Sequence, residues 1–265
     1  MKNQALAQVG QKVRVWPQGH VELADATLSA QSVELLGGSL GGASGVAADV
    51  LNDGTVAPGS ITRPLAIDGR YTQTGAGTLQ VRLEGSAASR LAITGSATLD
   101  GSVSVDLLDE LPPFWEPAPI LTARSIEGAL DAPAWPGAEG GFFMLDHGPE
   151  HVTLMAGLLG DMNLDGVIDT ADVAPFVLAL TDPQAYRDEF DVDEQTMIAA
   201  GDINQDGSFD TADVAPFVAL LVGGDWQPRV PEPGTLALLG LGGLMLLRRR
   251  RRPMADSAGP ALRPR

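Results

Sequence analysis

The chain has 265 residues, with 17 basic and 34 acidic side chains and no cysteine. This length allows one or two domains with a buried core. The absence of cysteine excludes disulfides, thiol nucleophiles and thiolate metal sites. Residues 1–247 hold 10 basic and 33 acidic side chains, a net charge of −23, which excludes a nucleic acid as the ligand of this part of the chain.

Residues 13–108 alternate apolar and polar side chains over short runs, separated by turn-forming residues. The alternation predicts half-buried β-strands, in the runs Val13–Val15, Val21–Leu23, Val33–Leu35, Leu79–Leu83 and Val103–Leu107. Predicted breaks lie at Gly37-Gly38, Gly41-Gly42, Asn52–Gly54 and Asp68-Gly69. Strands at this spacing fit a sandwich, a barrel or a β-solenoid. The many small side chains and the few aromatic ones favour the solenoid.

Five segments of this region carry a degenerate repeat pattern: Gly54–Gly59, Leu65–Gln73, Leu91–Gly95, Ala97–Gly101 and Ile120–Ala123. They resemble the closing segment of autotransporter-type β-helix passenger repeats, over residues 20–155. The resemblance implies a mainly β protein, with right-handed β-helix-like solenoid rungs over residues 1–111. Prolines interrupt the rhythm over residues 112–158, and we expect this segment to cap the stack. An unrelated all-β sandwich with similar turns is the alternative.

The strongest chemical signal is a duplicated acidic loop. Residues 160–180 and 201–221 are identical at 15 of 21 positions, and both contain D-x-N-x-D-G-x-x-D-x-x-D. Between residues 161 and 213 there are 14 acids and one base, so a cation is the natural means of neutralising them. A calcium ion takes about six to eight oxygen ligands, and a loop around it presents positions 1, 3, 5, 7, 9 and 12 inward. Glycine at position 6 allows the sharp turn.

We therefore predict two calcium ions that order residues 160–222 on binding. Backbone carbonyls are expected at position 7 and side-chain oxygens at the others. The alternative is a pair of solvated acidic turns. The predicted ligands are Asp161, Asn163, Asp165, Val167, Asp169 and Asp172 in the first loop, and Asp202, Asn204, Asp206, Ser208, Asp210 and Asp213 in the second.

Each loop is followed by Thr-Ala-Asp-Val-Ala-Pro-Phe-Val, which predicts a short helix that Asp169 or Asp210 caps. Pro175 and Pro216 are expected to open each helix or to kink its first turns. Apolar residues at helical spacing form two stripes that we expect to pack on each other, with a partner groove as the alternative. The stripes are Val173, Phe176, Val177 and Leu180, and Val214, Phe217, Val218 and Leu221.

The aspartate at loop position 12 and the tandem duplication resemble type I dockerin repeats. The resemblance implies a small α-helical, EF-hand-like module over residues 159–224. In that family, loop positions 10 and 11 contact a cohesin partner; these positions hold Thr170, Ala171, Thr211 and Ala212 here. Two departures put cohesin binding in doubt: the following helices lack Lys and Arg, and the linker Thr181–Ala200 is longer than usual.

The C-terminal residues have the pattern of a targeting signal. Pro231, Glu232 and Pro233 precede an uncharged apolar run, and Arg248, Arg249 and Arg250 begin a cluster of five arginines. The 14 residues from Gly234 to Leu247 would form a helix of about 21 Å, short of the ~30 Å hydrocarbon core of a membrane. This order resembles the PEP-CTERM sorting signal, over residues 225–252.

The resemblance implies that an exosortase-type enzyme cleaves near the Pro-Glu-Pro motif. Until then the short transmembrane helix holds the chain, with the arginines on the cytoplasmic side. Residues 253–265 depart from the pattern and are expected to form a disordered tail. Residues 1–15 contain no apolar signal region, so we expect either a true start upstream, with further rungs, or a gene remnant.

Together these features predict an exported protein of the cell surface or extracellular matrix with a structural or adhesive role and no enzymatic activity. A docking module for a cohesin-like partner is the second hypothesis, and an extracellular polysaccharide is another candidate ligand. A polysaccharide-active enzyme is the third. It is disfavoured because residues 1–155 lack clustered acids or bases. His147 and His151 flank an apparent turn and form no known catalytic motif.

Overall fold

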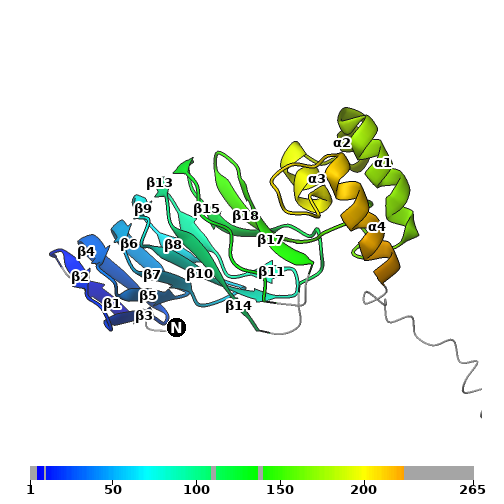
Figure 1. The fold of residues 1–265 in the computed structure, drawn as a ribbon. Coiled ribbons are helices and arrows are strands. Elements are labelled where there is room, and N and C mark those ends of the chain that lie inside the picture. Colours follow the sequence, from blue (N-terminus) through cyan, green and yellow to red (C-terminus); the bar gives the residue numbers. More distant parts are fainter. Residues whose placement is uncertain (1–4, 9, 109–111, 137–139, 224–265) are drawn as a thin grey trace, which may run out of the picture. The chain divides into compact units, whose positions relative to one another are not determined.

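The alternating runs of the N-terminal part form β-strands, and the acidic C-terminal part forms helices (Figure 1). The structure, a computed structural model, describes residues 5–8, 10–108, 112–136 and 140–223. All of them belong to one compact unit, residues 1–223. The described chain is mainly β, with mixed sheets and four short α-helices.

The strands are short and closely spaced along the chain. All five predicted runs lie in strands, namely in β2, β3, β4, β10 and β14. The strands are β1 (Ala5–Gln8), β2 (Val13–Val15), β3 (His20–Leu23), β4 (Ala26–Leu35), β5 (Ser39–Gly42), β6 (Gly45–Asn52), β7 (Thr55–Pro58), β8 (Leu65–Ile67), β9 (Tyr71–Gln73), β10 (Thr78–Glu84), β11 (Ala87–Ala88), β12 (Leu91–Ile93), β13 (Ser96–Leu99), β14 (Ser102–Leu107), β15 (Ala118–Thr122), β16 (Ser125–Gly128), β17 (Gly141–His147) and β18 (His151–Leu158).

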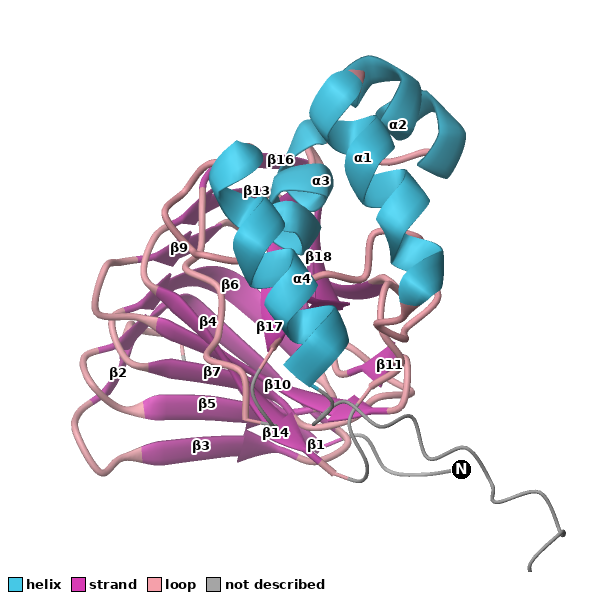
Figure 2. Cartoon of the chain, turned by 45° about the vertical axis from the view of Figure 1, so that its right-hand side comes forward, coloured by secondary structure: helices cyan, strands magenta, loops and turns pink. Residues whose placement is uncertain are grey.

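Most of the smaller sheet is built by parallel pairing between strands that are not adjacent in sequence, and the short β11 pairs antiparallel with β10. Figure 2 shows β3, β5 and β7 side by side, and β10 continues the series. Leu40 pairs with Val56, Val56 with Leu79, and Leu79 with Val103. These four apolar side chains form one buried column, since none is more than 4 % exposed. Alternation along each strand therefore puts like side chains on the same face, strand after strand.

The larger sheet begins in the same parallel manner and ends differently. Strands β6, β8, β12 and β15 pair in parallel in that order, whereas β15 and β18, and then β18 and β17, pair antiparallel. The change to antiparallel pairing falls in the proline-rich segment, residues 112–158, where the sequence rhythm also changes. One apolar core runs through both sheets, from Val15 to Ala156.

One predicted break is wrong. Gly41 and Gly42 lie inside β5 rather than between strands. At Gly42 the backbone of the neighbouring strand comes very close: a Cβ there would lie 2.2 Å from the carbonyl oxygen of Leu23. Gly42 also has φ +110°, which an L side chain rarely adopts. Two consecutive glycines are typical of a turn, but here the lack of a side chain at Gly42 allows neighbouring strands to pack closely.

A buried polar cluster crosses the core between strands. Asn52 Nδ2 donates to Tyr71 Oη at 3.0 Å and to Gln73 Oε1 at 3.1 Å, and Tyr71 Oη donates to Gln73 Oε1 at 2.7 Å. Gln73 Nε2 in turn donates to backbone carbonyls, including that of Asp100 at 3.0 Å. All three side chains are at most 1 % exposed. Such satisfied networks fix the register of the strands that carry them.

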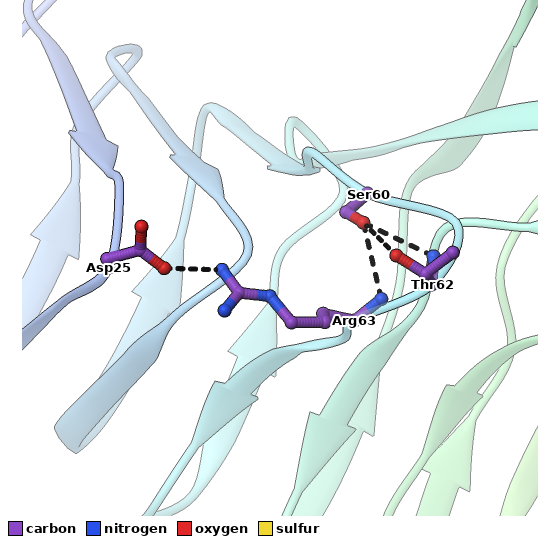
Figure 3. Close-up of polar contacts among 4 residues, drawn as sticks. All are labelled: Asp25, Ser60, Thr62 and Arg63. Atoms are coloured by element: carbon purple, nitrogen blue, oxygen red, sulfur yellow. Dashed lines mark hydrogen bonds and ion pairs between the residues drawn. The ribbon is translucent and has the colours of Figure 1, made fainter. Parts of the chain in front are cut away.

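A surface contact joins two loops at one side of the sheets (Figure 3). Arg63 donates to Asp25 at 2.9 Å, and the hydroxyl of Ser60 accepts from the backbone amides of Thr62 and Arg63 at 3.2 Å each. Both charged side chains are more than half exposed, so the ion pair adds little stability. Ser60 shapes the loop between β7 and β8.

Four α-helices follow the sheets in the described chain: α1 (Val173–Thr181), α2 (Pro183–Phe190), α3 (Glu194–Gly201) and α4 (Val214–Gly223). Helices α2 and α3 occupy the segment interpreted from sequence as an acidic linker. Their starts are capped by Asp182 and Asp193, whose side chains accept from the amides of Ala185 and Thr196. Pro183 stands at the first position of α2, where a missing N–H costs nothing.

A candidate cation-binding module

The two acidic loops fold in the same way, each into a turn that starts a helix. Asp169 and Asp210 cap short 3₁₀ turns, η1 (Thr170–Asp172) and η2 (Thr211–Asp213), as the sequence predicts. Each forms a reciprocal capping box with the aspartate three residues later. The helix follows directly, with Pro175 in the first turn of α1, where an amide hydrogen is not required.

The aspartate at position 12 closes each loop from the inside. Asp172 accepts from the backbone amides of Met162 at 2.8 Å, Asn163 at 3.0 Å and Asp169 at 2.9 Å. Both Asp172 and its counterpart Asp213 are fully buried. In the second loop, Asp213 accepts from Ile203, Asn204 and Asp210 at 2.9, 3.1 and 2.9 Å.

The aspartate at position 1 organises the front of each loop. Asp161 accepts from the amides of Asp165 at 3.1 Å and Gly166 at 2.8 Å. Asp202 accepts from the equivalent amides of Asp206 and Gly207 at the same distances. The glycines have φ +84° and +91°, in the left-handed region that position 6 was predicted to need.

Burial makes the negative charge of the first loop costly. Burial, together with the smaller effect of the neighbouring carboxylates of Asp172 and Asp165, raises the pKa of Asp161 to about 6, although hydrogen bonds to this carboxylate lower it. Burial also raises the pKa of Asp172, against three backbone hydrogen bonds that lower it. No ion pair within the described residues reaches either carboxylate. The protein partners of these two buried carboxylates are therefore hydrogen-bond donors rather than basic side chains.

The side chains of the first loop offer the type of ligand atom, oxygen, that a hard divalent cation prefers. Asp161, Asn163, Asp165, Asp169 and Asp172 offer only oxygen ligands within one short loop, and Val167 and Ser208 lie at the expected position 7. The side-chain directions are those of a loop closed on its own amides. Asn163, for example, accepts from the amide of Asp165 and donates to its carboxylate. Within the residues that the structure describes, no three acidic or histidine side chains converge closely enough to hold a metal ion.

Ligation would therefore require some side chains to turn from backbone amides toward a common point. Asp165, Asp169 and their counterparts Asp206 and Asp210 are exposed and can do so without repacking the core. The buried Asp161 and Asp172 both accept from backbone amides of this loop, Asp161 from Asp165 and Asp172 from Met162. The residues thus fit calcium by donor chemistry.

The helices after the loops meet through aromatic side chains. Phe176 of α1 and Phe217 of α4 stack with ring centroids 4.1 Å apart and planes 3° apart, and both are almost fully buried. The predicted packing of the two stripes on each other is confirmed for these residues. It is wrong for four valines, Val173, Val177, Val214 and Val218, which are 40 %, 51 %, 41 % and 51 % exposed. In sequence these valines follow the loop positions 10 and 11, which are also exposed, namely Thr170, Ala171, Thr211 and Ala212.

Sequence reasoning missed one residue of the site. Trp115, from the proline-rich segment, donates its indole N–H to the Asp161 carboxylate at 2.6 Å. It lines a cleft of about 720 Å³ together with Met144, Asp146, His151 and Asp193, among others. The signal available in sequence was weak: an aromatic pair, Phe114-Trp115, directly after two prolines.

The histidines occupy structural positions. His147 and His151 flank the turn of the β17–β18 hairpin, as predicted. His147 Nε2 accepts from the backbone amide of Leu130 at 3.0 Å, and burial lowers its pKa. His151 lies 3.8 Å from Asp146 at the surface.

In a comparison with known protein families, residues 229–252 match the PEP-CTERM protein-sorting motif. The predicted sorting residues, Pro231, Glu232, Pro233 and Arg248–Arg250, fall within it, and the sorting signal predicted from sequence is confirmed. The motif indicates an exported protein that an exosortase sorts to the cell surface. No curated protein matches the chain.

The sorting motif and the predicted tail lie outside the described residues. Among the helices that the structure does describe, none has the length and apolar character needed to cross a membrane.

Proposed function

We propose that this exported protein has a structural or adhesive role at the cell surface or in the extracellular matrix. Its stacked parallel strands form a β-solenoid capped by the antiparallel strands β15, β17 and β18. A dockerin-like module with two calcium ions stabilises residues 159–223 at the end of the described chain. After export, the sorting motif holds the chain at the membrane until an exosortase releases or transfers it.

The solenoid interpretation is supported by register. Strands β3, β5, β7, β10 and β14 of the smaller sheet pair in parallel with like residues aligned, as for Leu40, Val56 and Leu79, and only the two-residue β11 pairs antiparallel within the described part of this sheet. A sandwich would instead place hairpin-connected antiparallel strands next to each other. Such parallel stacks offer long, regular faces and suit scaffolding or adhesion.

The observation that carries the calcium proposal is the pair of buried aspartates in the first loop. Asp161 and Asp172 are fully buried, and no ion pair within the described chain compensates them. The same arrangement of loop amides around an aspartate recurs in the second loop with Asp213. A bound divalent cation would remove the repulsion that otherwise opposes folding of the module.

A thermal melt of the full chain tests this proposal. We expect calcium at about a hundred times its dissociation constant to stabilise the module by about 2.7 kcal/mol per site, and EDTA to remove the effect. Asp165→Asn, in the exposed part of the first loop, should reduce the calcium-induced shift. Asp188→Asn is the matched control, an exposed aspartate on α2 outside both loops. A melting temperature that EDTA leaves unchanged would contradict calcium binding.

A second function, docking of a cohesin-like protein, is favoured by the exposed valines. Val173 and Val177, and their counterparts Val214 and Val218, are exposed and follow the exposed loop positions 10 and 11 in sequence. A calcium-dependent partner captured from the same cells, and lost with the double variant Val177→Glu/Val218→Glu, would support docking. Leu108→Glu is the control, because Leu108 is equally exposed on the β part. Equal capture with and without EDTA would refute it.

We also propose that the protein is not an enzyme. The acidic groups of the described β part are dispersed or paired at its surface, as for Asp25 with Arg63 and Glu34 with Arg14. Turnover of an acidic polysaccharide, abolished by substitution of an acid in this part, would overturn the proposal and favour a glycan-active enzyme.

A further inference from the structure

The two acidic loops have nearly the same sequence and the same internal hydrogen bonds, but their surroundings differ. Asp161 is fully buried, whereas its counterpart Asp202 is only half-buried. A Cβ at Gly166 would lie 3.7 Å from the ring of Phe114, but one at Gly207 would find nothing within 4 Å. The first loop is thus covered by another part of the chain, and the second faces solvent at the same point.

Two polar contacts distinguish the first loop from the second: Tyr186 Oη donates to the backbone carbonyl of Met162 at 2.8 Å, and Trp115 contacts the carboxylate of a predicted ligand. The indole N–H of Trp115 donates to Asp161 Oδ2 at 2.6 Å, and the same oxygen accepts from the amide of Gly166 at 2.8 Å. In the second loop, Asp202 Oδ2 accepts only from the amide of Gly207. A carboxylate with two donors on one oxygen has little freedom to rotate, so less entropy is lost when it binds an ion.

The position of Trp115 is itself tightly determined. Its backbone N–H donates to the carbonyl of Ala156 in β18 at 2.7 Å, and its ring meets Phe142 edge-on at 5.9 Å. Its φ of +63° is uncommon for a bulky residue and costs free energy that surrounding contacts must offset. The preceding Phe114 packs against Trp135 of the β core at 5.8 Å. The pair therefore joins the β part to the first loop.

We infer that Trp115 is a positioning residue that makes the two calcium sites unequal: it holds Asp161 in place, so the first site binds more tightly and is coupled to the β part. The inference rests on the proposed calcium binding. The second loop, with the same ligands and no such contact, binds independently and serves as an internal reference.

Calcium titration of the full chain by calorimetry, after removal of metal, tests the inference. We expect two sites in the wild type. Trp115→Phe keeps a ring against Phe142 but removes the N–H, and it should weaken one site about tenfold, the scale of one hydrogen bond to a charged group. The other site should be unchanged. Trp16→Phe, at an exposed position of the β part, is the matched control and should leave both sites unchanged.

Tryptophan emission assigns the affected site. We expect a calcium-dependent change that persists in Asp202→Asn and disappears in both Asp161→Asn and Trp115→Phe. This readout does not depend on fitting two binding constants, and it also reports whether Trp115→Phe retains a native-like fold. A loss of stability alone would lower both affinities and would not single out Asp161.

The outcomes separate the two proposals. If the wild type binds two ions and Trp115→Phe changes both affinities equally, or changes neither by more than about twofold, a difference of ~0.4 kcal/mol, the inference is overturned and calcium binding stands. An emission change that survives Asp161→Asn also overturns it. If the wild type binds no calcium, the inference and the calcium proposal fail together.

Discussion

Truncation of Phe217 tests whether the aromatic stack holds the helical module together. Phe217 is 3 % exposed and stacks on Phe176 with ring centroids 4.1 Å apart. A buried Phe removes roughly 200 Å² from water, which at about 25 cal/mol per Å² gives an upper limit of about 5 kcal/mol. Large-to-small changes of this kind cost about 3–5 kcal/mol in well-packed cores. For the small core of this module, we expect Phe217→Ala to lose about 3–4 kcal/mol.

Urea unfolding, followed by the helical circular dichroism signal, measures the loss. Val218→Ala is the matched control, since Val218 is the next residue on α4 and is 51 % exposed; we expect it to cost less than about 0.5 kcal/mol. The double variant Phe176→Leu/Phe217→Leu closes a cycle that should show about 1 kcal/mol of coupling between the rings. Equal losses for Phe217→Ala and Val218→Ala would refute the assignment of the stack as the core of the module.

Three further predictions concern the β part. Tyr71→Phe removes a hydroxyl that is hydrogen-bonded to Asn52 at 3.0 Å inside the core, and it should cost about 1–2 kcal/mol in chemical unfolding; no loss would mean that the network does not contribute. Gly42→Ala forces a Cβ to 2.2 Å from the carbonyl of Leu23 and should destabilise by more than about 2 kcal/mol, with a lower melting temperature. The folded-state pKa of His147 lies below its usual 6.5 because of burial. The unfolded chain therefore binds the proton more readily, and stability should fall as pH drops below that value. The decline should be absent in His147→Gln, and an identical pH profile for both proteins would argue against it.

The local sequence pattern predicted those structural features that depend only on residues close together in the chain. The alternation in Leu79–Leu83 predicted a strand because period-2 burial is a local property, and Leu79, Val81 and Leu83 are indeed buried. The capping role of Asp169 was likewise visible, since a cap acts on amides two or three residues away. The sorting motif is a contiguous signal and was found on that account.

Features that depend on distant contacts were not predictable in this way. Trp115 and Asp161 are 46 positions apart, and no local sequence motif near either residue predicts the hydrogen bond between them. Gly41-Gly42 looked like a break because close strand approach and turn formation both call for glycine. Helices α2 and α3 were not predicted, because the segment between the two loops was interpreted as an acidic linker. Asp182-Pro183 and Asp193 are nevertheless typical of helix N-termini.

The in-register column of Leu40, Val56, Leu79 and Val103 affects how the length of the β part can change. Each strand added to such a stack makes contacts only with its neighbours, so a duplicated turn of chain can be accepted without redesign of the rest. Neighbouring strands lie about 4.8 Å apart, which makes the length of the β part adjustable in steps of that size. A surface protein built in this way can change its length by gene duplication, while its C-terminal sorting motif stays as it is.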